Sequence, residues 1–269
     1  MASDAAHADD ASIARVYGLA LGGSRGNSAD RETLDDFLRD YPLFGAIARV
    51  NRMFLRRLVR HLALLGIDQF LDLGSGVPSD DPGDNVHEIA RAVDPAARVV
   101  YVERDPVAAG AWRQVLEGDE RAAVIEGDIA EPGSVWHDPR TTGLLDPGRP
   151  VAVLMSAVLH FFDDEAAARL VRGYLRPLAP GSYLGLSQAG GDDAAARPAL
   201  STYGARVHHV HLRGRAEVTA FFDGLELVEP GVVLRPEWHP EPGVALDADS
   251  RAVLRARAGY CGLGRKPEA

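Results

Sequence analysis

The sequence predicts an α/β fold built on a doubly wound, mainly parallel sheet. From Phe70 onward, short apolar runs alternate with helical patterns, and this order favours parallel strands joined by helices. The run that begins at Val151 is almost entirely apolar, as expected of a strand that is covered on both faces. The chain has 269 residues, of which 46% are hydrophobic, and this is enough for one domain of this class with additions.

The first 65 residues are predicted to precede the main domain, which we place at residues 66–266. Residues 1–11 are rich in Ala and Asp, and we expect a disordered tail there. Residues 12–65 repeat apolar side chains every three or four positions, which predicts a helical extension or lid. A second helical face carries Arg49, Arg52, Arg56 and Arg60. A solvated surface explains this face as a whole, although one or two of its members could point into a site.

Turn and capping residues separate the predicted elements of the main domain. Strands are predicted at residues 70–73, 99–102, 122–125, 151–155, 182–186, 225–234 and 259–264. Helices are predicted at residues 85–93, from 106 onward, at 165–175 and at 217–222. Asn85 and Glu88 have the spacing of a capping box, while Asp105 and Pro106 suit the N-cap and first position of the following helix.

Charge and cysteine content exclude several classes of function. The formal net charge is -10, whereas proteins that bind duplexes need positive charge against the phosphates, so we expect no nucleic-acid partner. Cys261 is the only cysteine, which excludes an intrachain disulfide and a cysteine-based metal site. The N-terminus lacks the apolar core of a signal peptide, and the longest apolar run, Val151 to Phe162, is too short to cross a bilayer. We therefore expect a cytoplasmic protein without a membrane partner.

Glycine and acidic residues follow the first three predicted strands. Ligands of open α/β sheets bind beyond the carboxyl ends of the strands, and Gly74-Ser75-Gly76 lies at the first such end. Glu103 ends the second strand and can accept both hydroxyls of a ribose, while Asp128 follows the third and can accept from an adenine amino group. A surface acid is the alternative for Glu103, and a loop cap is the alternative for Asp128. The pattern predicts an adenosine pocket without phosphate contacts.

A nicotinamide dinucleotide fits this pattern less well. Its fingerprint needs a third glycine that leads directly into a helix, but Ser79 stands there and an acidic loop, residues 78–84, follows. Asp80, Asp81 and Asp84 would repel a pyrophosphate, whereas a ligand with positive charge beyond its ribose tolerates them.

Short segments along almost the whole chain, residues 12–266, match one family. They are Ala14–Tyr17, Leu21–Gly23, Asp30–Arg31, Asn51–Arg52, Phe70–Gly76, Asn85–Glu88, Val100–Pro106, Ala157–Phe161, Leu178–Tyr183 and Phe221–Val228. With these segments the chain resembles the actinobacterial S-adenosyl methyltransferase family, a branch of the class I methyltransferases that was long a domain of unknown function. The first segment departs from the family pattern, because Gly18 and Ser24 replace an aspartate and a lysine, and Ser28 replaces an aromatic residue.

The resemblance implies a Rossmann-like, seven-stranded sheet whose last strand is antiparallel, with the helical extension over the pocket. It implies S-adenosylmethionine as cofactor, with its methionine part lined by Gly74, Ser75 and Gly76. By the same motif positions, Glu103 would hold the ribose and Asp128 the adenine amino group. Asp72 would contact the turn or the ammonium, and Arg52 beside Asn51 would contact the carboxylate. From their positions in the chain, Ile129 could pack on the adenine face or be an ordinary core isoleucine, and Ser156 leaves the fourth strand next to where the methyl group would be presented.

Candidates for the transfer step leave the fourth and fifth strands. His160 could take a proton from the acceptor, and its alternative is a histidine that holds the strand exit. Tyr17 and Arg31 could face the pocket, and Ser187 with Gln188 could touch the acceptor or form a turn.

His208, His209 and His211 raise the possibility of a metal, but no acid lies nearby in similar register. We therefore predict no metal site there.

The sequence therefore predicts a methyltransferase that uses S-adenosylmethionine and a small-molecule acceptor, with oxygen or nitrogen as the methylated atom. Two alternatives remain open: a catalytically silent protein that binds S-adenosylmethionine as a regulator, and a nicotinamide-dependent oxidoreductase.

Overall fold

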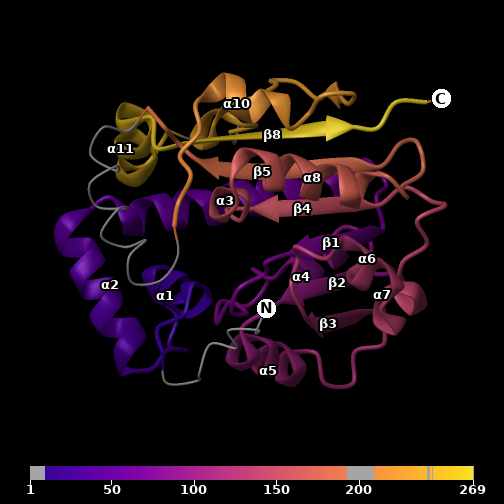
Figure 1. Ribbon diagram of the computed structural model, residues 1–269, viewed down its shortest axis with the longest axis horizontal. Coiled ribbons are helices and arrows are strands. Elements are labelled where there is room, and N and C mark those ends of the chain that lie inside the picture. The colour runs from indigo at the N-terminus through magenta and orange to yellow at the C-terminus, as the bar shows by residue number, and fades with distance from the viewer. Residues whose placement is uncertain (1–9, 193–208, 241–242, 244, 269) are drawn as a thin grey trace.

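A central sheet covered by helices on both faces forms the body of the protein (Figure 1). The computed structural model describes residues 10–192, 209–240, 243 and 245–268. The strands are β1 (Gln69–Leu73), β2 (Arg98–Glu103), β3 (Ala122–Glu126), β4 (Ala152–Ser156), β5 (Tyr183–Ala189), β6 (Glu226–Leu227), β7 (Val233–Leu234) and β8 (Gly259–Arg265).

The helices fall into an N-terminal group and a group that connects the strands. The first group is α1 (Ile13–Ala20), α2 (Ser28–Asp40) and α3 (Phe44–Leu64). The second is α4 (Val86–Arg91), α5 (Pro106–Val115), α6 (Pro132–His137), α7 (Pro139–Leu144), α8 (Asp164–Leu175), α10 (Arg215–Ala220) and α11 (Ala248–Ala256). Two single 3-10 turns, η1 (Leu159–Phe161) and η2 (Arg235–Glu237), follow β4 and β7.

The strand order is β3-β2-β1-β4-β5-β8-β6, and β7 also pairs with β8. All pairs up to β5 are parallel, and β8 runs antiparallel to β5, β6 and β7. Leu227 pairs with Gly264 and Leu234 with Tyr260, so β6 and β7 lie along successive parts of β8 and share one position. The predicted doubly wound, mainly parallel sheet with one reversed strand is confirmed, with eight strands in seven positions.

The single strand predicted at residues 225–234 is wrong. The sequence Glu229-Pro230-Gly231 interrupts it, because proline has no N–H for a ladder and Gly231 has a φ of 80°. The Gly231 N–H instead donates to the carbonyl of Val228 at 2.8 Å, which closes a turn between β6 and β7. Helices α6, α7 and α11, of six to nine residues, were not predicted.

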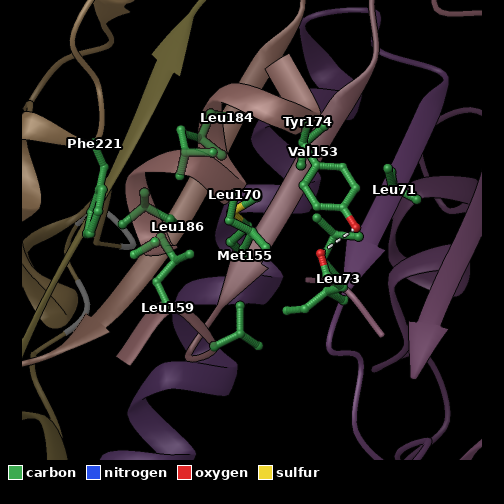
Figure 2. Packing of buried hydrophobic residues seen from close by; sticks show 14 of the residues in the cluster. Leu71, Leu73, Val153, Met155, Leu159, Leu170, Tyr174, Leu184, Leu186 and Phe221 are labelled. Carbon is green, nitrogen blue, oxygen red and sulfur yellow. Dashed lines mark hydrogen bonds between the residues drawn. The ribbon is translucent and has the colours of Figure 1, made fainter. Parts of the chain in front are cut away.

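Apolar clusters on the two faces of the sheet hold the helices in place. One combines alternate residues of the central strands with α6, α8 and α10, and the other combines the intervening residues with α3, α4 and α5. In the first cluster Leu170 and Tyr174 of α8 lie against Val153 and Met155 of β4 (Figure 2). The Tyr174 hydroxyl donates to the carbonyl of Ile129 at 3.0 Å, so this packing also fixes the loop after β3.

Helices α1 and α2 lie beyond the ends toward which the parallel strands run (Figure 1). Helix α2 begins with a capping box, in which Asn27 accepts from the Asp30 N–H and Asp30 accepts from the Asn27 N–H, at 2.9 and 2.8 Å. Most of the tail predicted at residues 1–11 lies outside the described residues. None of the described helices combines the length and the apolar character needed to cross a membrane.

Candidate functional site

A cavity of about 780 Å³ lies between the carboxyl ends of the parallel strands and helices α1 to α3. Its volume falls within the range of about 300–1,000 Å³ that is usual for small-molecule sites. The structure brings all the predicted cofactor and catalytic residues to its lining: Tyr17, Arg52, Asp72, Gly74, Ser75, Gly76, Glu103, Asp128, Ile129, Ser156 and His160.

The glycine turn after β1 forms part of the floor. Gly74 and Gly76 have φ values of 69° and 66°, which favour glycine over residues with a Cβ. A Cβ on Gly74 would also come within 2.4 Å of the Val158 side chain. The N–H groups of Gly74 and Ser75 donate to the carbonyl of Val102 at 2.9 and 3.2 Å, so β2 fixes the position of the turn.

Glu103 is held between two loops by its carboxylate. One oxygen accepts from the Gly76 N–H and the other from the Asp105 N–H, both at 2.8 Å. The side chain is 5% exposed, and burial raises the pKa of its carboxyl group. The Arg104 N–H also acts on this carboxylate, and of its roughly four lone-pair sites Glu103 keeps capacity to accept from a ligand hydroxyl.

Asp72 adds a second buried carboxyl group to the floor. Burial raises the pKa of Asp72 to about 7, the positive charge of Arg52 opposes this shift, and the nearby Glu103 adds to it. Arg52 also lies near Asp84, with Nε 3.6 Å from the carboxylate. Of the four arginines on the predicted second face of α3, only Arg52 lines the cavity. This part of the cavity therefore places one arginine beside two buried carboxyl groups, those of Asp72 and Glu103.

Asp128 and Ile129 follow β3 at the rim of the cavity. One Asp128 oxygen accepts from the Ala130 N–H at 2.8 Å, so the loop-cap role holds here, while the residue also lines the cavity. Ile129 is buried, and its carbonyl accepts from Tyr174.

A hydrogen-bond network connects the N-terminal helices to the ends of β4 and β5. The Asn51 amide donates to the Tyr17 hydroxyl at 2.9 Å and to the Ser156 hydroxyl at 3.1 Å. Its carbonyl oxygen accepts from Ser187 at 2.6 Å. Burial raises the pKa of Tyr17, so the phenol is protonated at neutral pH while it accepts from Asn51. Ser187 acts through this network and is not itself part of the cavity lining.

The backbone after β4 adopts an unusual conformation. Ala157 has a φ of 58°, which is uncommon for a residue with a Cβ, and its N–H donates to the Ser187 hydroxyl at 3.0 Å. His160, in the 3-10 turn η1 that follows, lines the cavity, and its carbonyl accepts from the His211 N–H at 2.7 Å. The backbone of His160 therefore holds the strand exit while its ring borders the cavity.

Arg15 joins α1 to two other helices in the buried interior. Its guanidinium donates to Asp30 in α2 at 2.7 Å and to Asp105, the N-cap of α5, at 2.6 Å. All three side chains are at most 4% exposed. Sequence reasoning missed this junction, because one arginine in a helix gives no sign of partners 15 and 90 positions away.

Two of the residues that depart from the family pattern, Gly18 and Ser24, contact the loop after the glycine turn. A Cβ on Gly18 would lie 2.2 Å from the Val77 side chain, so glycine permits a close approach there. The Ser24 N–H and hydroxyl donate to Asp80 at 3.1 and 3.0 Å, and Arg25 pairs with the same carboxylate.

Other candidates lie away from the cavity. Arg31 is exposed and donates to the carbonyls of Ser24 and Gly26, so the expectation that it faces the pocket is wrong. Gln188 is buried and does not line the cavity. His208 lies outside the described residues. His209 and His211 have ring centroids 4.7 Å apart, and the described part of the chain gathers no group of three possible metal ligands.

Part of the cavity lining was not predicted at all. Aromatic residues Phe37, Tyr41 and Phe44 and the cationic Arg235 border the cavity away from the glycine turn. The apolar periodicity of the N-terminal segment predicts a buried face but not which ligand that face meets. Arg235 follows a short, irregular strand pair, and no motif distinguishes it.

Comparisons with known proteins agree with this geometry. A family model described as S-adenosyl methyltransferase matches residues 1–267. A Streptomyces avermitilis protein of the DUF574 family is 38% identical, with a TM-score of 0.88 over 97% of this chain and 100% of that chain. A Thermobifida fusca YX protein that is provisionally assigned as a methyltransferase is 35% identical, with a TM-score of 0.89 over 96% of each chain.

More distant similarity concerns the fold alone. The magnesium protoporphyrin IX methyltransferase ChlM from Synechocystis PCC 6803, solved with bound S-adenosylhomocysteine, is 13% identical over 93% of each chain, with a TM-score of 0.54. A search of curated protein sequences found no match. The family match over nearly the whole chain and the two relatives above 30% identity show that this chain belongs to the S-adenosyl methyltransferase family, and it is a methyltransferase with S-adenosylmethionine as its methyl donor.

Proposed function

We propose that the protein transfers the methyl group of S-adenosylmethionine to an oxygen or nitrogen atom of a small molecule that binds in the cavity. The observation that carries this proposal is the position of the cavity. Helices α1 and α2 cover the carboxyl ends of the strands, and α1 contributes Ser12, Ile13 and Tyr17 to the lining. A covered cavity of about 780 Å³ suits a cofactor with a small acceptor better than a macromolecular substrate.

The charges of the cavity fit this cofactor. S-adenosylmethionine carries a sulfonium and an ammonium against one carboxylate, and the floor offers the buried carboxyl groups of Asp72 and Glu103. We assign Asp72 to the ammonium, Glu103 to the ribose hydroxyls and Arg52 to the carboxylate, because arginine pairs well with carboxylates. Gly74, Ser75 and Gly76 would line the methionine part.

The adenine would lie at the rim beside β3. Asp128 keeps one carboxylate oxygen beyond its bond to Ala130, and that oxygen would accept from the adenine amino group. Ile129 would pack on the adenine face, and Ser156 would mark the boundary between cofactor and acceptor.

The bound cofactor supplies a methyl group on a sulfonium, which is transferred by in-line displacement. This chemistry depends on alignment and on exclusion of water. Asn51 fixes Tyr17 and Ser156 at the cavity wall, and the N-terminal helices keep water out. His160 is the proposed base for an acceptor that is protonated at working pH.

Calorimetric titration with S-adenosylmethionine, S-adenosylhomocysteine and NAD tests the cofactor assignment. We expect micromolar binding of the first two and no binding of NAD. A screen of small molecules for formation of S-adenosylhomocysteine then tests transfer. Cofactor binding without turnover across the screen would instead support a regulatory protein.

A Glu103→Ala variant tests the residue assignments. We expect its affinity for S-adenosylhomocysteine to fall at least about tenfold, because hydrogen bonds to charged groups contribute about 1.5–3 kcal/mol. The exposed Glu120→Ala variant is the matched control, and thermal unfolding shows whether loss of the bonds to Gly76 and Asp105 has unfolded the protein. Unchanged affinity in a folded Glu103→Ala protein would refute the assignment.

A further inference from the structure

The cavity has a second end that the cofactor assignment does not use. Its lining there is mainly aromatic and aliphatic, from α2, α3 and the segment that precedes α10: Phe37, Tyr41, Phe44, Ile47, Val210 and Leu212. These side chains pack together as one cluster. In the sheet order, β5 and β8 lie on the other side of β4 from β1, β2 and β3. The cavity lining includes Ala189 and Gly190 at the end of β5 and Ala258 before β8, so this side of the cavity is free for an acceptor if the cofactor occupies the side beside β1, β2 and β3.

One buried cation stands at this apolar end. Arg235 begins η2 after β7, lines the cavity, and is 2% exposed. Its Nη1 donates to the Ala258 carbonyl at 3.2 Å and its Nη2 donates to the Gln188 carbonyl at 3.0 Å. Its Nε has no hydrogen-bond partner within the described part of the chain. Gly259 makes room for the guanidinium, because a Cβ there would come within 2.4 Å of Nη1.

The other buried arginines show what Arg235 lacks. Arg15 pairs with the carboxylates of Asp30 and Asp105, and Arg213 pairs with that of Asp164. No carboxylate of the described residues forms an ion pair with Arg235. Burial lowers the pKa of its guanidinium, and the nearby titratable side chains, Tyr17, Tyr41 and Cys261, carry no charge while protonated and so supply no counter-ion. A buried charge without a counter-ion is costly, and a planar guanidinium suits a carboxylate or another oxyanion.

We propose that the methyl acceptor is a small anion with an aromatic or aliphatic body, and that its anionic group pairs with Arg235. This inference rests on the proposed function, because it names the acceptor class of the same cavity. Tyr17 lies between the two ends: it is near Arg235, and its hydroxyl accepts from Asn51, which also donates to Ser156. An acceptor anchored at Arg235 thus extends along this wall toward Ser156, where we place the boundary with the cofactor.

Paired acids and amides test the proposal without knowledge of the natural acceptor. The probes are benzoate, phenylacetate and indole-3-acetate, each beside its neutral primary amide, with phenyl phosphate as a further arm. Dissociation constants are measured by ligand-observed NMR on the full chain saturated with S-adenosylhomocysteine. We expect at least one acid to bind at least about tenfold more tightly than its amide. Tighter binding of phenyl phosphate than of the carboxylates would make the anionic group a phosphate ester.

Two variants test whether the preference for acids over amides depends on Arg235. Arg235→Gln should lose the acid-over-amide preference while its affinity for S-adenosylhomocysteine stays unchanged. Arg57→Gln is the matched control, because Arg57 also donates to two backbone carbonyls, those of Trp238 and Arg235, but does not line the cavity. This control should keep the preference.

The outcomes separate this inference from the proposed function. Equal binding of acids and amides, no binding of any acid, or a preference that survives in Arg235→Gln would overturn the anionic acceptor. Failure of the wild-type protein to bind S-adenosylhomocysteine would overturn the proposed function instead. If Arg235→Gln does not fold, the comparison of acids with amides in the wild-type protein still decides.

Discussion

At the scale of single residues, the floor of the cavity depends on how burial changes the protonation of its acids. Asp72 precedes the glycine turn, and burial raises its pKa to about 7. Burial also raises the pKa of the nearby Glu103. A cationic ligand group next to Asp72 would favour the ionised form and lower the pKa again. Cofactor binding by this floor is therefore expected to release a proton near neutral pH.

The affinity for S-adenosylmethionine should consequently rise with pH. Free Asp72 holds a proton below about pH 7, and this proton must leave when the ammonium binds, so affinity falls as pH decreases, by at most about tenfold per pH unit. Calorimetry between pH 5.5 and 7.5 would measure this slope. Asp72→Asn should bind weakly with a reduced slope, whereas exposed Asp81→Asn should behave as wild type. A pH-independent affinity in the wild-type protein would contradict the role of Asp72.

At the scale of elements, the position of α1 depends on buried ion pairs rather than on apolar packing alone. Arg15 joins α1 to α2 through Asp30 and to α5 through Asp105, and Asp105 also bonds to Glu103 through its N–H. The cover of the cavity and the proposed ribose site are thus coupled through one residue. Asn51 makes a second connection from α3 to β4 and β5.

Replacement of Arg15 should destabilise the whole protein. Arg15→Met leaves the carboxylates of Asp30 and Asp105 buried without their partner, and we expect the free energy of unfolding to fall by about 3–5 kcal/mol. Urea denaturation measures this change. Arg39→Met is the control, because Arg39 is exposed and pairs with Asp36 only at the surface, and it should cost less than about 1 kcal/mol. Similar losses in the two variants would disprove a special role for the Arg15 junction.

Tyr174 should contribute more modestly through the loop after β3. Tyr174→Phe removes the hydrogen bond to the Ile129 carbonyl while keeping the ring in the core (Figure 2). We expect a loss of about 1 kcal/mol in the free energy of unfolding, measured in urea. Gain or no change in stability would mean that this hydrogen bond does not hold the loop.

At the scale of the whole molecule, the sheet presents a cavity and the N-terminal helices cover it. A ligand that enters a covered cavity needs the cover to open, and a bound ligand then favours the closed arrangement. We therefore treat residues 12–65 as a proposed lid, with α1 as the part that moves.

Hydrogen exchange with and without S-adenosylhomocysteine would test this lid. Amides of α1 should become more protected when the ligand binds, while those of α8, which packs on the sheet through Leu170 and Tyr174, should exchange as before. Protection limited to the loops after β1, β2 and β3 would argue against a lid.

Most strands of the sheet can be predicted from local sequence, and the interval 225–234 is the exception. The runs at Phe70, Val99, Ala122 and Val151 predict β1 to β4 because their apolar residues suit strands that are buried on both faces. The Asp105 cap likewise gives the start of α5. The interval 225–234 misleads because its apolar content conceals the turn at Pro230 and Gly231.

The sequence by itself determined the five parallel strands and the last strand, the glycine turn and the acids at the strand ends, since these depend on neighbouring residues and on the rule that parallel strands end at one edge. Only the tertiary structure decided which polar groups meet across long separations, such as Arg15 with Asp105 and Asn51 with Ser187. It also decided that Arg235 is buried near aromatic residues and forms no ion pair with any carboxylate of the described residues. The physical reason is that charge pairing and burial depend on packing between distant elements, which no local pattern records.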